Sequence, residues 1–193
     1  MAGGTRLVLA SGSPQRRAIL EQLGVAFEVR VTGVDELTEG RPEAVAVENA
    51  RRKARAAASE PDEAGPGAGL VVLGVDTLVA LDYGIYGKPA DRAEAVATLT
   101  ALAGRRHRVV SGICLIEPDG ERTAAAVTQV GFRPMSEAAI AWYADTGEWQ
   151  GRAGGYAIQG RGAALVESIH GDYLNVVGLP VATLLDLLPS LLF

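Results

Sequence analysis

The chain has 193 residues, of which 48% are hydrophobic and 21% are charged, and its formal net charge at pH 7 is −5. This composition predicts a sizeable buried core, arranged as one domain or as two lobes that share a core. The acidic balance argues against a broad nucleic-acid surface, although a few local cations and a metal ion suffice for a single phosphate ligand.

A single cysteine, Cys114, excludes any disulfide within the chain and is predicted to be a buried strand thiol. No segment reaches the roughly 18 apolar residues of a membrane span. We therefore expect a soluble, cytoplasmic protein that binds neither a membrane nor a nucleic-acid polymer.

Residues 6–10 read as a first strand, followed by a loop of small residues and a helix. Ser13 is placed to cap this helix, and Gly24 is placed to end it. The free N–H groups of the first turn, with Arg16 and Arg17, would form a receptor for an anion. A capped helix with solvated arginines is the alternative.

A second strand is predicted over residues 27–32, and the carboxylates of Asp35 and Glu36 follow it. They are candidate metal ligands, although two acidic loop residues are commonly just solvated. An alanine-rich helix follows over residues 42–59. Most of its charge is expected to face solvent, while one or two of its cations, such as Lys53, could point into a cleft.

The apolar run that begins at Val71 places Asp76 at what we interpret as the end of a strand, beside the hydroxyl of Thr77. The chain then turns over residues 82–84 and returns to Lys88. A carboxylate within an apolar run is costly unless it is paired, hydrogen-bonded or bound to a metal. With a lysine nearby, it could handle a phosphate together with a metal ion. A hairpin with a surface ion pair is the alternative.

The rest of the chain alternates predicted strands and helices. Its predicted elements are a loop over 60–69, a helix over 91–103, strands over 106–117 and 121–132, a helix over 136–146, a strand over 164–169 and a helix over 181–188. The glycine-rich block 147–180 is neither a dinucleotide fingerprint nor a P-loop. Its Gln159 could read the edge of a base, because an amide both donates and accepts. His107 and His170 are not spaced as a zinc pair.

Phosphate-seeking or metal-seeking groups thus lie in four separate segments. Together they predict a cleft for a polyphosphate and a divalent cation, in which a carboxylate activates water for hydrolysis. The segments contribute Ser13 with Arg16 and Arg17, Glu36, Lys53, and Asp76 with Lys88.

Three long stretches resemble the Maf family of nucleoside triphosphate pyrophosphatases, also called septum formation inhibitor proteins. They are LASGSPQRRAILEQLG (9–24), LGVDTLVALD with GKP (73–89), and AGGYAIQGRGAALVESIHGDYLNVVGLP (153–180). The resemblance implies an α/β fold, a mixed twisted sheet with flanking helices and two lobes around a deep cleft, as in inosine triphosphatase. It also implies a single domain over 1–193 that cleaves a nucleoside triphosphate to the monophosphate and pyrophosphate with a divalent metal, Mg or Mn.

The resemblance also implies a role for each site residue. It makes Asp76 the catalytic proton acceptor and places Glu36 with Asp76 on the metal side. The substrate-contacting positions that it implies are Ser13, Gln15, Arg16, Lys53, Thr77, Lys88 and Gln159.

The pair Asp76-Thr77 and the run Ile158-Gln159-Gly160 match the branch of the family that acts on dTTP and UTP. Gln15 departs from that branch, because it replaces the first arginine of Ser-Pro-Arg-Arg. The same reaction on 7-methyl-GTP or another purine or modified nucleotide is therefore one alternative. A nucleotide-binding regulator of cell division that needs no hydrolysis is another, and the hairpin 106–132 could pair with a second copy.

Overall fold

Seven strands pair into one mixed sheet in the computed structural model, which describes residues 6–60 and 69–192. The strand order is β2-β1-β3-β5-β6-β7, and β4 pairs with β3 alone. β1 is parallel to β2 and β3, whereas β4 is antiparallel to β3 and β7 is antiparallel to β6. The strands are β1 Arg6–Ala10, β2 Phe27–Val29, β3 Leu70–Leu81, β4 Gly84–Tyr86, β5 Arg106–Glu117, β6 Gly120–Phe132 and β7 Val166–His170. The predicted mixed sheet with flanking helices is confirmed.

The helices follow the predicted order, with one addition near the C-terminus. They are α1 Pro14–Gln22, α2 Pro42–Ala58, α3 Arg92–Leu102, α4 Glu137–Ala144, α5 Tyr173–Val177 and α6 Val181–Leu187. Short 3-10 turns lie at Ala153–Gly155, Arg161–Leu165 and Pro189–Leu191. The short helix α5 has no counterpart among the predicted elements.

The chain divides into two compact units. The first comprises Met1–Asp76, Ser111–Ala126 and Gly178–Phe193, and the second comprises Thr77–Val110 and Val127–Val177. β3, β5 and β6 therefore each contribute residues to both units. The predicted deep cleft between two lobes stays a prediction.

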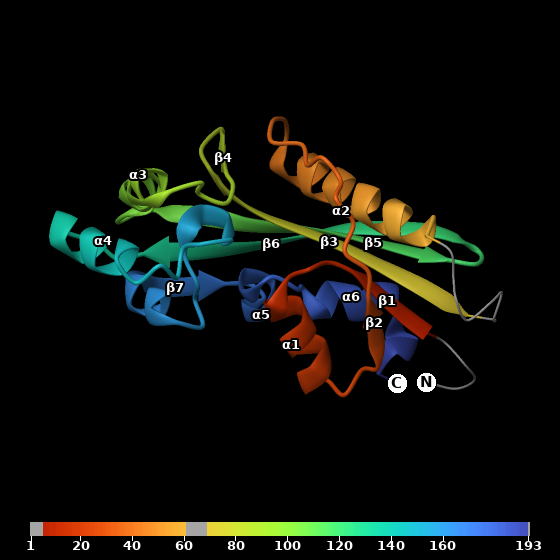
Figure 1. Ribbon diagram of the computed structural model, residues 1–193. Coiled ribbons are helices and arrows are strands. Elements are labelled where there is room, and N and C mark those ends of the chain that lie inside the picture. The colour runs from red at the N-terminus through yellow and green to blue at the C-terminus, as the bar shows by residue number, and fades with distance from the viewer. Residues whose placement is uncertain (1–5, 61–68, 193) are drawn as a thin grey trace. The chain divides into compact units, whose positions relative to one another are not determined.

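In the first unit, α2 lies along the sheet (Figure 1). It packs closely on the sheet through a face of alanines. Ala46, Ala50 and Ala54 follow one another at intervals of one helical turn, and none of them is exposed to solvent. Glycines on the strands permit this approach. A Cβ atom on Gly74 would lie 2.1 Å from the carbonyl oxygen of Ala50, and one on Gly112 would lie 2.2 Å from that of Ala46.

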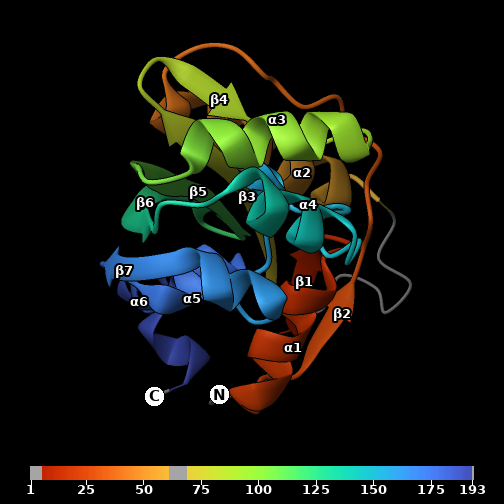
Figure 2. The same ribbon diagram turned by 90° about the vertical axis from the view of Figure 1, so that its left-hand side faces the viewer.

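The second unit has a core that combines leucines with aromatic rings, and α3 and α4 lie side by side over it (Figure 2). His107 is 1% exposed, and its ring packs edge-on against Phe132 and Tyr156. Its Nε2 lies 2.9 Å from the hydroxyl of Tyr156. Burial lowers the pKa of His107 to about 4, because desolvation disfavours the imidazolium. His107 is therefore a neutral core residue at pH 7.

This buried imidazole predicts a loss of stability in weak acid. The unfolded chain binds the proton below the ordinary pKa of 6.5, whereas the folded chain binds it only near pH 4. The free energy of unfolding should therefore fall by about 3 kcal/mol as the pH drops from 6.5 to 4. Urea denaturation across this range should show a flatter dependence of the free energy of unfolding on pH for His107→Phe than for the wild type. Equal slopes for His107→Phe and the wild type would contradict the prediction.

Several predicted boundaries are wrong. Asp76 lies inside β3, not at its end, since its charge is paired and the strand continues to Leu81. β2 ends at Val29, so Asp35 and Glu36 follow a loop and not the end of a strand. β7 begins at Val166 because residues 161–165 form a 3-10 turn. Of the loop predicted over 60–69, residues 61–68 lie outside the described part.

Cys114 is buried, as predicted, and burial raises the pKa of its thiol to about 12. It packs with Val8, Ala50 and Val72 under α2. Among residues 6–60 and 69–192, no helix has the length and apolar character required to cross a membrane.

Candidate active site

Asp76 is a buried carboxylate whose two oxygens are held by one face of α2. The residue is 6% exposed. Oδ1 lies 2.6 Å from Nζ of Lys53, and Oδ2 accepts a hydrogen bond of 3.1 Å from Nδ2 of Asn49. Asn49 and Lys53 are four residues apart and so lie on the same side of the helix. The cost of burying the Asp76 charge is therefore offset by a counter-ion and a hydrogen bond.

Lys53 connects Asp76 to a second carboxylate. Its Nζ also lies 2.6 Å from Oε1 of Glu36, whose side chain is 37% exposed. Lys53 itself is 9% exposed. The oxygens of Glu36 and Asp76 thus converge on one positive charge. Two of the predicted functional carboxylates and the predicted lysine are brought together by the first unit alone.

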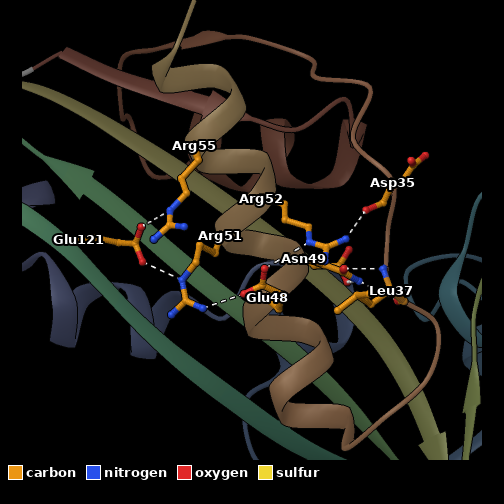
Figure 3. A network of polar contacts seen from close by, with 9 residues as sticks. Asp35, Leu37, Glu48, Asn49, Arg51, Arg52, Arg55 and Glu121 are labelled. Carbon is orange, nitrogen blue, oxygen red and sulfur yellow. Dashed lines mark hydrogen bonds and ion pairs between the residues drawn. The ribbon is translucent and has the colours of Figure 1, made fainter.

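The loop that carries Glu36 is fastened to α2 by side chains on either side of it (Figure 3). The amide of Asn49 accepts a 2.7 Å hydrogen bond from the N–H of Leu37 and donates one of 3.0 Å to the carbonyl of Leu37. Nη1 of Arg52 donates to the carbonyl of Asp35. The backbone on both sides of Glu36 is therefore bound to the helix that carries Lys53.

A network of ion pairs anchors α2 to the sheet (Figure 3). Arg51 pairs with Glu48 and with Glu121 of β6, and Arg55 pairs with the other oxygen of Glu121. Burial acts to raise the pKa of Glu121, but hydrogen bonds from Arg51 and Arg55 outweigh it and lower that pKa. Glu48 also pairs with Arg52, one turn further along α2. Partly exposed pairs of this kind each add modest stability, so their main effect is to fix the helix position.

Arg16 is buried, and backbone and side-chain oxygens hold its guanidinium. Its Nε donates to the carbonyl of Gly178, and its Nη1 donates to Oγ of Ser11. Burial lowers the pKa of Arg16, and the charges of Asp76 and Glu36 oppose that shift. The parallel register pairs Ala10 with Gly74, so the loop after β1 lies level with Asp76. Arg16 is therefore close enough to Asp76 and Glu36 for their charges to act on it, whereas Arg17 is exposed to solvent.

The predicted side-chain cap by Ser13 is wrong. Ser13 does precede α1, but its side chain makes no capping bond and instead donates to Oε1 of Gln15. Ser11 holds the loop in its place, since its Oγ accepts from Arg16 and from the N–H of Ser13. Ser11 thus fixes the loop before the helix, while the first turn of α1 receives no side-chain cap from Ser13.

Thr77, Lys88 and Gln159 belong to the second unit, and their grouping with Asp76 stays a prediction. Within that unit, the segments of Lys88 and Gln159 are joined by backbone contacts. The N–H of Gly154 donates to the carbonyl of Gly87, and a Cβ atom on Gly155 would lie 3.1 Å from Cγ of Pro89. Lys88 and Gln159 are both exposed.

The loop around Gln159 is built on the carboxylate of Glu148. This carboxylate accepts hydrogen bonds from the N–H groups of Arg161 and Gly162. A Cβ atom on Gly160 would lie 2.5 Å from Glu148 Oε2, so only glycine fits there without a shift. Gly160, which follows Gln159, thus permits this close approach.

Sequence reasoning missed two polar residues of the site, Asn49 and Ser11. Asn49 lies one turn from Lys53 on α2. A usable signal was present, because a short amide stands between alanines on the face of α2 that packs on the sheet. Ser11 lies in the recognised loop but offers no distinguishing signal in the sequence.

The donor set near Asp76 suits a hard divalent cation. Both carboxylates offer oxygen, and they already meet at a single cationic atom, Lys53 Nζ. Within residues 6–60 and 69–192, no three His, Cys, Asp or Glu side chains gather as a metal site. A pair of carboxylates completed by substrate and water oxygens is how magnesium commonly binds at phosphate sites.

Comparisons with known proteins match most of the chain. The family model described as "Maf-like protein" matches residues 6–191. A protein of Deinococcus radiodurans named "dTTP/UTP pyrophosphatase" is 45% identical over 184 residues, which cover 95% of this chain and 91% of that protein. Proteins of the same name from Symbiobacterium thermophilum and Nitratidesulfovibrio vulgaris are 48% and 47% identical, over 91% and 94% of this chain and 89% and 86% of their own lengths.

Proposed function

This chain belongs to the family of Maf-like proteins, and we propose that it hydrolyses nucleoside triphosphates to the monophosphate and pyrophosphate, with dTTP and UTP as preferred substrates. The observation that carries the proposal is the buried Asp76, paired with Lys53 and joined through it to Glu36. The names of the three relatives support the reaction and the two bases. Residues 1–193 would form a single such domain, and pairing with a second copy stays a prediction.

In the proposed reaction, Asp76 accepts a proton from the water that cleaves the bond between the α- and β-phosphates. A carboxylate held within hydrogen-bond reach of a water can act as a general base. The ammonium of Lys53 contacts both carboxylates, and the charges of the same carboxylates act on the buried guanidinium of Arg16. These two cations would hold the negative charge that develops on the phosphoryl oxygens. Thr77, Lys88, Ser13 and Gln15 would contact the substrate, and Gln159 would bind the base through its amide.

The proposed cofactor is a divalent cation, Mg or Mn, held by Glu36 and Asp76. When bound, it would neutralise phosphate charge and polarise the phosphoryl group. Because Lys53 Nζ lies between the same two carboxylates, Lys53 has to share or yield that position when the cation arrives. Its side chain would then be available to a phosphate.

Pyrophosphate release from a panel of nucleoside triphosphates with magnesium tests the proposal. We expect the largest kcat/KM for dTTP and UTP, and lower values for GTP, ATP, inosine triphosphate and 7-methyl-GTP. Product analysis should give the monophosphate and pyrophosphate in equal amounts, with no inorganic phosphate.

The same panel of nucleotides also tests the role of Gln15. In this chain the side-chain oxygen of Gln15 accepts a hydrogen bond from the hydroxyl of Ser13. A preference for a purine or methylated nucleotide would keep the reaction and assign the altered base choice to this loop. No release from any nucleotide by the folded protein would overturn the enzyme and favour a nucleotide-binding regulator.

A further inference from the structure

The side chain of Asn49 has no role in the reaction proposed above, yet it contacts Asp76 and the backbone of Leu37, the residue that follows Glu36. The residue is 2% exposed, and each polar atom of its amide is used. Oδ1 accepts from Leu37 N–H, while Nδ2 donates to the Leu37 carbonyl and to Asp76 Oδ2. These partners fix the orientation of the amide. A flipped amide would place its oxygen against a carbonyl and a carboxylate, both of which only accept.

These contacts set the position of Glu36 relative to Asp76. Leu37 follows Glu36 directly, so a bidentate hold on the Leu37 backbone restrains the Glu36 main chain. The same amide holds Asp76 at 3.1 Å. One side chain on α2 thus binds both the exposed loop and the buried strand. Figure 3 shows the contacts of Asn49 with Leu37 of the loop.

Lys53 cannot do this alone. Its ammonium contacts both carboxylates, but it is a flexible, non-directional charge on a long stem. If a divalent cation takes the place between the carboxylates, the lysine bridge is the contact that changes. The bonds of Asn49 do not involve that place and can persist.

We propose that Asn49 is a positioning residue that holds Glu36 and Asp76 at the separation required to bind one divalent cation. This inference rests on the proposed function. Hydrogen-bond partners of metal ligands commonly contribute 10- to 100-fold to metal affinity or activity, and we expect Asn49 to act in that range.

The test uses Asn49→Leu, which keeps the shape and removes all three hydrogen bonds, and Asn49→Asp, which keeps an acceptor for Leu37 N–H but loses both donors. Manganese binding is measured by electron paramagnetic resonance with α,β-methylene-dTTP present, beside kcat as a function of magnesium concentration. We expect the manganese affinity of both variants to fall by about tenfold or more. Excess magnesium should restore much of the rate of the Asn49 variants, but not that of Asp76→Asn.

Asn175→Leu is the matched control for loss of a buried asparagine. Asn175 is fully buried and donates to the carbonyl of Val109 and to Thr128 Oγ1, within the second unit. We expect this variant to lower the unfolding temperature and to leave the manganese affinity of the folded protein unchanged. Asn49→Asp provides the measurement if Asn49→Leu does not fold.

Wild-type manganese affinity in both Asn49 variants, with hydrolysis by the wild type intact, would overturn the positioning role and leave the proposed function standing. Equal losses in Asn49→Asp and Asn175→Leu would overturn it as well, because they would indicate a general effect of stability. No hydrolysis and no manganese binding by the wild type would overturn the proposed function, and this inference with it.

Discussion

Asp76→Asn is expected to lower the kcat for dTTP hydrolysis by about a thousandfold. The substitution keeps the size of the side chain but removes the negative charge and the base. It also places an N–H donor where Lys53 and Asn49 both donate. A positioned general base contributes roughly 10²- to 10⁴-fold to a rate, and the loss here includes a ligand of the proposed cation. Pyrophosphate release at saturating dTTP and magnesium measures the effect.

Asp35→Asn is the matched control, because Asp35 is an exposed carboxylate in the loop of Glu36. Its backbone carbonyl accepts from Arg52, while its carboxylate points away from that contact (Figure 3). We expect the activity of Asp35→Asn to stay within about twofold of the wild type, since surface substitutions of this kind have small effects. If Asp76→Asn retained a tenth of the wild-type rate, Asp76 would not be the proton acceptor.

Gly74→Ala is expected to destabilise the protein by about 3 kcal/mol or more, or to prevent folding. The added Cβ would lie 2.1 Å from the carbonyl oxygen of Ala50 and 2.8 Å from Cβ of Ala54. These atoms are a backbone oxygen and a Cβ atom of α2, so there is no flexible side chain that could move aside. The helix would have to shift from the strand. Because α2 also carries Lys53 and Asn49, we expect activity to be lost together with stability.

Gly33→Ala is the matched control in the same unit. No atom lies within 4 Å of a Cβ atom placed on Gly33, so the methyl group causes no overlap. We expect a change in the free energy of unfolding within about 0.5 kcal/mol, since the effect is confined to chain entropy and solvent exposure. Urea denaturation of both variants measures the difference. Equal stability of Gly74→Ala and the wild type would contradict the close packing of α2.

The sequence predicts most of the elements because their signals are local. Apolar runs indicated β1 and β3, and the carboxylate of Asp91 caps the helix α3 that was predicted over 91–103. Gly24 follows the end of α1 with a positive φ of 70°, as a terminating glycine should. Predictions failed where a long-range contact decided the outcome. Asp76 continues a strand because a helix from another part of the chain supplies its counter-ion.

For the site, the sequence by itself determined which chemical groups are available: two carboxylates, a lysine, an arginine and a base-reading amide, together with their likeness to one family. Only the tertiary structure decided which of them meet. The approach of α2 to β3 places Lys53 between Glu36 and Asp76. It also lets Asn49 bind Asp76 and the backbone of Leu37, next to Glu36. That approach requires glycine at position 74, because a Cβ atom there would overlap the carbonyl oxygen of Ala50 in α2. The two residues are far apart in the chain. The spacing of residues along a sequence indicates local structure, whereas the fit of a helix against a strand depends on the shapes of both surfaces.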